Sequence, residues 1–271
     1  MVKVAFQGER GAFSEDAAVK LFSGNIDVLP CRRLKEVFEL VSQDNVEFGV
    51  VPVENSQAGS INEAYDLLLA YPLNIFAEVI IKVTHCLMAL PGEKLADITT
   101  IYSHPQALAQ CDEFLSKLKV EIIPSYDTAG SAKMIREKRL RNCAAIASKR
   151  AADIYRLEIL ATEIETNVNN YTKFVAISKQ KAKPAQKNKT SLVFIAAHKP
   201  GALYKILGIF ATRNINLAKL ESRPSKAKPW EYVFYVDFEG HLDGEVYQEA
   251  MLELQKEATF VKILGSYPQA V

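Results

Sequence analysis

Short apolar runs alternate with amphipathic segments along the first two thirds of the chain. Seven of these runs are typical of strands: Lys3–Phe6, Ile26–Leu29, Phe48–Val53, Thr100–Tyr102, Val120–Ile123, Ala144–Ala147 and Phe174–Ile177. Helical segments between them favour an α/β fold with mainly parallel sheets. A longer, mostly apolar stretch, Ile75–Leu90, is interrupted by Glu78, Lys82 and His85 and predicts that the chain passes from one sheet into a second. We therefore expect two lobes with a cleft between them.

The last third of the chain has a different order of elements. An apolar strand, Ser191–Ala197, precedes a helix that Pro200-Gly201 opens, with an apolar stripe at Leu203, Ile206, Leu207 and Phe210. The elements after it are strand Ile215–Leu220, turn Arg223–Pro229, strand Trp230–Phe238, a helix capped by Asp243 with Tyr247, Ala250, Met251 and Leu254 on one face, and strand Phe260–Leu264. The order βαββαβ predicts a ferredoxin-like sandwich, with two helices on one face of an antiparallel sheet.

The segment Lys179–Lys189 is lysine-rich, contains Pro184 and has no apolar periodicity, so it predicts a solvated linker. A chain of 271 residues also favours two domains. We expect a first domain at 1–180, a linker at 181–189 and a second domain at 190–271. Within the first domain, lobe one would span about 1–80 plus 165–180, and lobe two about 81–164.

Composition excludes several classes of protein. A net charge of +1 gives no reason to expect a nucleic-acid or membrane-surface partner, and no apolar run approaches the roughly 20 residues of a membrane-spanning helix. The N-terminus lacks the pattern of a signal peptide. The four cysteines form no CxxC pair, which favours a reducing, cytoplasmic location, and the four histidines lack the spacing of metal ligands, so we expect no metal.

Polar turns follow four of the expected strands. They are Gln7–Ser14, Glu54–Ser60, Ser103–Gln106 and Asp127–Ser131. In open α/β sheets ligands bind beyond the carboxyl ends of strands, where helix N-termini attract anions. Each turn also has a structural explanation: Ser14 and Asp127 can cap helices, the glycines can permit tight turns, and Glu54-Asn55-Ser56 can form a buried network. Together the turns indicate a protein that binds or transforms a small anionic metabolite.

Six segments resemble the motifs of the prephenate dehydratase family, in the family's order. They are Gly8–Ser14, Val51–Ser56 with Gly59, Ser103–Cys111, Asp127–Ala132, Ala144–Ser148 and Asn170–Phe174. The similarity is closest at Ser103–Cys111, which reads SHPQALAQC against the family's SHPQALxQC. The collinear set covers essentially the whole chain. It implies a two-lobed catalytic region like that of type II periplasmic binding proteins.

The C-terminal unit is similar to the ACT regulatory domain of the same family. Gly201-Ala202-Leu203 resembles its GAL motif and Glu221-Ser222-Arg223-Pro224 its ESRP motif. In the family these loops bind phenylalanine at a subunit interface, so the resemblance implies L-phenylalanine as an allosteric ligand and a homodimer or homotetramer. As an alternative, Glu221 and Arg223 are simply solvated charges.

The resemblance also implies roles for individual residues. Prephenate would lose carbon dioxide and its ring hydroxyl to give phenylpyruvate without a cofactor, with Thr172 as hydrogen-bond donor to the leaving oxygen. Asn55, Ser103 and Gln110 would position the substrate, and Glu54 would orient the site. The other substrate-binding residues implied are Lys173, Phe174, Ser56, Gly8, Ser14, Thr128 and Ala129.

One departure from the family concerns Lys173, which stands where the family has arginine. Lysine keeps the positive charge but loses the planar fork that grips a carboxylate. Two other functions stay open at this stage. Arogenate dehydratase performs the same chemistry on an amino substrate, and a non-catalytic sensor of amino acids or small carboxylates would also have two lobes and an ACT unit.

Overall fold

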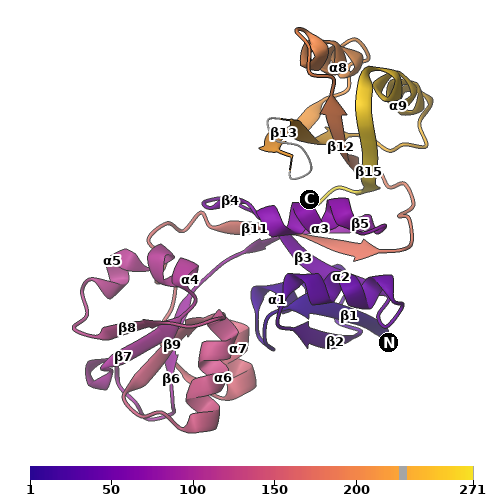
Figure 1. Cartoon of the computed structure of the whole chain (residues 1–271). Coiled ribbons are helices and arrows are strands. Elements are labelled where there is room, and N and C mark those ends of the chain that lie inside the picture. Colours follow the sequence, from indigo (N-terminus) through magenta and orange to yellow (C-terminus); the bar gives the residue numbers. More distant parts are fainter. Residues whose placement is uncertain (226–230, 271) are drawn as a thin grey trace. The chain divides into compact units, whose positions relative to one another are not determined.

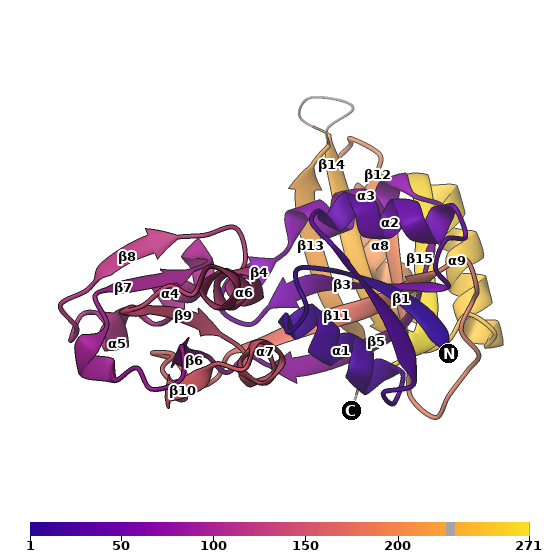
Figure 2. The same ribbon diagram turned by 90° about the horizontal axis from the view of Figure 1, so that it is seen from below.

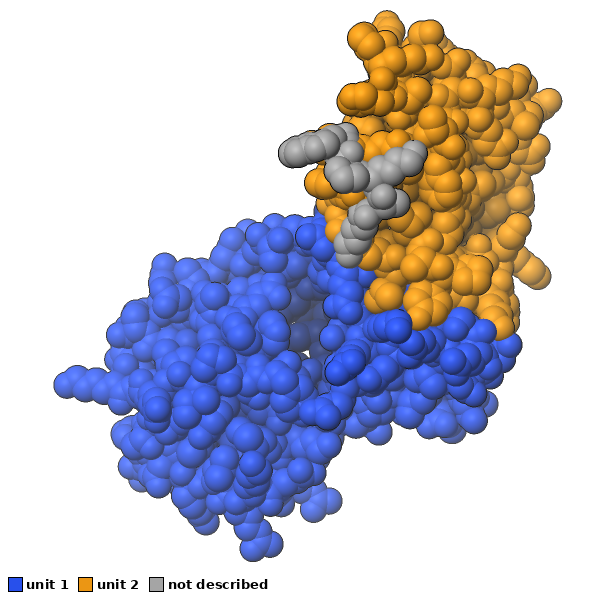
Figure 3. Space-filling view, viewed as in Figure 1, with its two compact units in different colours: residues 1–64, 80–174 blue, residues 65–79, 175–271 orange. Residues whose placement is uncertain are grey.

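The computed structural model describes residues 1–225 and 231–270. The chain forms two compact units, which we describe separately (Figure 3). Unit 1 comprises Met1–Ala64 and Ile80–Phe174, and unit 2 comprises Tyr65–Val79 and Val175–Val271. This division cuts through α3 (Asn62–Ala70), β5 (Asn74–Lys82) and β11 (Tyr171–Ser178), and so differs from the ranges expected from the sequence. Those expected domain boundaries stay a prediction.

The first sheet begins unit 1 and has the strand order β2-β1-β3-β11-β5, with the short β4 paired to β3. Its remaining elements are β1 (Val2–Gln7), α1 (Phe13–Leu21), β2 (Ile26–Cys31), α2 (Leu34–Ser42), β3 (Phe48–Asn55) and β4 (Gly59–Ser60). β1 pairs in parallel with both β2 and β3. Helix α2 forms because Leu34, Val37, Phe38 and Val41 recur at helical spacing, and all four are at most 1% exposed.

The second sheet of unit 1 has the order β10-β6-β9-β7-β8. Its elements are β6 (Cys86–Ala89), the 3-10 turn η1 (Leu95–Asp97), β7 (Thr100–Ser103), α4 (Pro105–Gln110), α5 (Asp112–Leu115), β8 (Glu121–Pro124), α6 (Thr128–Lys138), β9 (Cys143–Ala147), α7 (Lys149–Tyr155) and β10 (Glu158–Ala161). Figure 2 shows these strands lying together. The apolar stretch Ile75–Leu90 breaks after β5 and resumes as β6 in this second sheet, so the predicted passage between sheets is confirmed.

Unit 2 contains the predicted βαββαβ order. It consists of β12 (Asn188–Ala196), α8 (Ala202–Ala211), β13 (Leu217–Pro224), β14 (Tyr232–Glu239), α9 (Glu245–Glu257) and β15 (Ala258–Pro268), and its antiparallel sheet has the order β13-β14-β12-β15. Helices α8 and α9 cover one face of this sheet (Figure 1). The fold class, two α/β lobes and a ferredoxin-like unit, is therefore confirmed. The expected start of the third strand at Trp230, and most of the turn before it, lie outside the described residues.

Helix caps were predicted correctly in one case out of three. Asp127 does cap α6, and its side chain accepts a hydrogen bond from Gly130 N at 2.7 Å. Ser14 lies inside the first turn of α1, whose N-cap is Ala12. Asp243 lies one residue before the N-cap of α9, Gly244, because the chain is still turning there: Gly244 N donates to His241 O.

The segment Lys179–Lys189, expected to be solvated, ends in a strand and a buried lysine. Asn188 and Lys189 belong to β12, and Lys189 is 5% exposed. The Nζ atom of Lys189 lies 2.7 and 2.8 Å from the two carboxylate oxygens of Glu78, which is also buried. A lysine can be buried when a carboxylate neutralises it, and this partner is 111 residues away in the sequence.

The sheet of unit 2 also binds residues of α3. Lys262, on β15, donates from Nζ to the carbonyls of Leu68, Leu69 and Tyr71 at 2.7–2.8 Å, so it satisfies the exposed carbonyls at the end of that helix. Burial lowers the pKa of Lys262. No helix in the described ranges is long and apolar enough to cross a bilayer.

Candidate active site

A cavity of about 190 Å³ in unit 1 is lined by β3 and β11 of the first sheet, by helices α1, α4 and α6, and by loop residues. Of the residues implicated by sequence, it brings together Ser14, Asn55, Gln110, Thr128, Thr172 and Phe174. The other lining residues are Phe13, Pro52, Ile61, Val83, His85, His104, Gln106 and Ala107. Strand ends and helix starts far apart in the sequence therefore meet at one place, as the polar turns predicted.

A series of hydrogen-bonded amides connects two residues that line this cavity, Asn55 and Gln110, and backbone groups fix its direction. The side-chain oxygen of Asn55 accepts from the N–H groups of Gln57 and Ala58 at 3.0 and 2.9 Å. Because a backbone N–H can only donate, the amide nitrogen of Asn55 must face the other way. It donates to Asn170 Oδ1 at 2.8 Å and to Thr172 Oγ1 at 2.9 Å.

The series of amides continues from Asn170 to Gln110. Since Asn170 Oδ1 faces Asn55, its amide nitrogen donates to Gln110 Oε1, at 3.0 Å. The same oxygen of Gln110 lies 2.9 Å from His85 Nε2. The side chains of Gln110 and Thr172 thus belong to one network, although they come from α4 and β11.

Thr172 is placed to act as a donor to a ligand. It is 8% exposed, and its oxygen already accepts from Asn55. Within the described chain its hydroxyl proton has no hydrogen-bond acceptor. The proton is therefore available to an oxygen bound in the cavity, at the position where the resemblance assigns the donor to the leaving group.

The electrostatic character of the cavity suits an anion. None of its lining side chains is a carboxylate, and the first turns of α1 and α6 contribute Phe13, Ser14 and Thr128. Helix N-termini carry unpaired N–H groups and a partial positive charge. At the N-cap of α6, burial raises the pKa of Asp127, whose carboxyl group accepts a hydrogen bond from Gly130 N.

Ser103 does not line the cavity. It is fully buried, and its hydroxyl donates to Ile146 O at 2.7 Å. Gly8 is also absent from the lining: a Cβ there would lie 2.9 Å from Ala12 Cβ and 3.0 Å from Asp127 Oδ2, so this glycine allows close packing. Ala129 is fully buried inside α6.

Three further residues implicated by sequence lie beside the cavity rather than in its lining. Ser56 Oγ donates to Asn169 O at 3.1 Å and accepts from Tyr171 N at 2.9 Å, so it fastens the turn after β3 to the start of β11. Lys173 Nζ lies 2.8 Å from Glu54 Oε2. The predicted partner of Lys173, a substrate carboxylate, would therefore compete with Glu54.

Sequence reasoning assigned no role to His85 or to Asn170. Asn170 belongs to the motif Asn170–Phe174, two positions before Thr172, and this proximity was the signal that could have found it. His85 is a lone histidine in an apolar run, for which a buried structural role is the ordinary explanation. Its pKa is lowered, mainly by burial, while the hydrogen bond to Gln110 opposes this shift.

In unit 2 the two predicted phenylalanine-binding motifs contribute to different cavities. Gly201 caps α8 with φ +78°, and Ala202 and Leu203 line a cavity of about 410 Å³. Glu221 pairs with Lys219, and Arg223 pairs with Asp66 of α3, so these are not simply solvated charges. Ser222 and Pro224 are exposed. Arg223 and Pro224 line a second cavity, of about 350 Å³.

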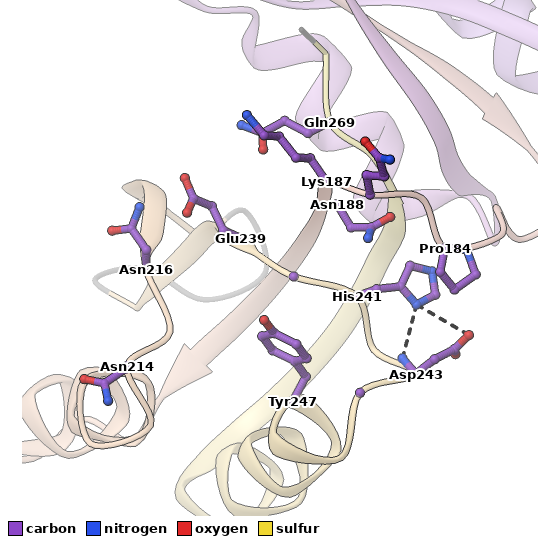
Figure 4. A pocket seen from close by; sticks show the side chains of 13 residues that line it. Pro184, Lys187, Asn188, Asn214, Asn216, Glu239, His241, Asp243, Tyr247 and Gln269 are labelled. Atoms are coloured by element: carbon purple, nitrogen blue, oxygen red, sulfur yellow. Dashed lines mark hydrogen bonds and ion pairs between the residues drawn. The ribbon is translucent and has the colours of Figure 1, made fainter.

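Another cavity of unit 2, of about 750 Å³, contains none of the predicted site residues. Asparagine and glutamine side chains line much of it (Figure 4). At its edge Asp243 N donates to His241 Nδ1 at 3.1 Å.

Two family models match this chain. Residues 4–182 match prephenate dehydratase and residues 190–254 match the ACT domain. The chain belongs to the prephenate dehydratase family. Arogenate dehydratase/prephenate dehydratase 2, chloroplastic, of Arabidopsis thaliana is 44% identical over 98% of this chain and 73% of its own length.

Two solved structures are similar over nearly the whole chain. Prephenate dehydratase of Arthrobacter aurescens in complex with L-Phe is 30% identical, with a TM-score of 0.90 over 98% of this chain and 90% of the other. A structure described as GqqA, a novel type of quorum quenching acylase, is 34% identical, with a TM-score of 0.89 over 98% of both chains. This chain is thus an enzyme of the dehydratase family with a regulatory ACT domain.

Proposed function

We propose that this chain converts prephenate to phenylpyruvate by decarboxylating dehydration, under feedback control by L-phenylalanine. The observation that supports it best is the Thr172 hydroxyl, whose oxygen is occupied by Asn55 and whose proton is free to meet a ligand in a cavity without carboxylates. Membership of the family alone leaves the substrate open between prephenate and arogenate.

In the proposed reaction the ring carboxylate leaves as carbon dioxide, and its bonding electrons complete the aromatic ring. The ring hydroxyl departs at the opposite carbon, taking its own electron pair. Thr172 donates a hydrogen bond to this oxygen and stabilises the charge that develops on it, an effect worth about 10²–10³ in rate for a well-placed donor. Asn55 holds the threonine in place, and Gln110 with the starts of α1 and α6 binds the anionic substrate.

The lining of the cavity favours prephenate over arogenate. Arogenate carries an ammonium group, which needs acceptors, whereas the keto oxygen of prephenate needs donors. The cavity has no carboxylate side chain to accept from an ammonium group. The oxygen of Asn55 accepts from two backbone N–H groups and that of Gln110 accepts from two side chains.

The contacts of the cavity do not favour an acylase that uses a side-chain nucleophile. Such a nucleophile is activated by a neighbouring base. The hydroxyl groups that line the cavity belong to Ser14, Thr128 and Thr172, and in the described structure none of them hydrogen-bonds to a histidine or a carboxylate.

The regulatory part of the proposal follows from the ACT domain and from the L-Phe complex of the Arthrobacter relative. Phenylalanine would bind where the GAL motif of one subunit meets the ESRP motif of another, in a homodimer or homotetramer. A second subunit would then complete the site. Ligand binding would then favour one of two enzyme states by differential affinity.

Assays with both substrates test the proposal. Purified protein is given prephenate or arogenate in parallel, with and without L-phenylalanine, and the aromatic product is measured. We expect a higher kcat/KM for prephenate and a lower rate when phenylalanine is present. A preference for arogenate would reject the substrate assignment, and a rate unaffected by phenylalanine would reject the regulatory part.

A further inference from the structure

His85 occupies an unusual position at the edge of the cavity. It lies in the break between β5 and β6, is 2% exposed, and contributes to the cavity lining. Its Nε2 atom is 2.9 Å from Gln110 Oε1. Its other ring nitrogen, Nδ1, is buried without a hydrogen-bond partner in the described part of the chain. The ring also meets Phe13 edge to face, at 5.7 Å between centroids.

The amide chain determines which nitrogen of His85 carries the proton. Backbone N–H groups fix the orientation of Asn55, and this orientation fixes that of Asn170 and then of Gln110. The atom of Gln110 that faces His85 is therefore an oxygen. Only a protonated Nε2 can form this bond, so a neutral His85 is the Nε2–H tautomer and its Nδ1 is unprotonated.

This arrangement turns the acceptor of Gln110 away from a ligand. Its oxygen accepts two hydrogen bonds, from His85 and Asn170, so its NH₂ group is the end left for the cavity. The N–H groups that Gln110 presents to the cavity are consequently donors. A keto oxygen can accept from them, whereas an ammonium group would find the amide oxygen already occupied.

Building on the proposed function, we infer that His85 is a positioning residue that sets the preference for a keto over an amino substrate. It acts through Gln110: the Nε2–H group keeps the glutamine oxygen engaged and its NH₂ group toward the substrate. Without this donor the oxygen has one partner fewer, and it becomes available to the ammonium group of arogenate.

Paired variants test this role by the ratio of kcat/KM for prephenate to kcat/KM for arogenate. In His85→Leu the donor is lost, and we expect the ratio to fall about tenfold, the effect of one buried hydrogen bond. In His85→Gln a side-chain NH₂ can replace Nε2–H, and the ratio should return toward that of the wild type. His241→Leu, a histidine of unit 2 that lies outside this cavity, is the matched control and should leave the ratio unchanged.

Several outcomes would overturn the inference. An unchanged ratio in His85→Leu, with both activities lowered alike, would mean that His85 only supports the fold. Nitrogen NMR of the histidine rings in the wild-type protein gives an independent result, because a proton found on Nδ1 of neutral His85 contradicts the deduced tautomer even if the leucine variant does not fold. A wild-type enzyme that prefers arogenate would instead reject the substrate proposal, while the NMR result would still report on the tautomer.

Discussion

Replacing Thr172 by valine removes the proposed donor while nearly keeping the shape of the side chain. The structural cost should be small, since Asn55 Nδ2 keeps Asn170 Oδ1 at 2.8 Å and has the carbonyl of Tyr171 at 3.2 Å as a second acceptor. Losing one hydrogen bond of this kind costs about 1 kcal/mol of stability. The same change should lower kcat far more, by about 10²–10³, because the donor acts on charge that develops in the transition state.

The measurement is the rate of phenylpyruvate formation at saturating prephenate, together with thermal unfolding followed by circular dichroism. Thr172→Ser keeps a hydroxyl group at this position and serves as the matched control, which should retain most of the activity. A folded Thr172→Val enzyme with kcat within about threefold of wild type would refute the role of the threonine, since such a change is worth less than 1 kcal/mol.

Two further predictions concern stability. Lys189→Met leaves the charge of Glu78 buried and unpaired, which should lower the free energy of unfolding measured in urea by about 3–5 kcal/mol. Combining Lys189→Met with Glu78→Leu should recover most of this loss. Equal losses in the two proteins would contradict the prediction. Burial raises the pKa of Asp16 to about 6, a shift that Arg150 opposes. The charged form is therefore less favourable in the folded state, and the wild type loses stability as the pH rises from the unfolded value of 3.8 through about 6. Asp16→Asn should thus unfold at a higher temperature than wild type at pH 8, with a difference that shrinks toward pH 4.5; a difference independent of pH would disprove the assignment.

Local sequence patterns predicted most strands of the chain, because a short apolar run bounded by polar turns is typical of a strand and of few other elements. They failed where a distant partner decides the outcome. Lys189 stands at the end of a lysine-rich segment and looks solvated, but the carboxylate that permits its burial belongs to β5. Glu78, for its part, appeared only as an interruption in an apolar run.

The candidate site, too, was predicted only in part. Asn55 and Thr172 do meet, 2.9 Å apart, as the resemblance implied. Ser103 was expected beside them because it follows a strand, but it is the last residue of β7 and shares the buried face with Ile101. Sequence shows that a strand ends near such a residue, whereas the alternation of side chains decides which face it occupies. No local pattern in the sequence pointed to His85, because the role that we propose for it depends on the orientation of three amide side chains.

The cap that Lys262 forms on α3 bears on where this protein can be divided. A fragment that ends before β12 would keep the helix but lose the ammonium group that satisfies the carbonyls of Leu68, Leu69 and Tyr71. It would also leave Glu78 without its counter-charge. Removing the C-terminal sheet therefore does more than remove a regulatory domain. A loss of activity in such a fragment would reflect damage to the fold before it gave information about allosteric regulation.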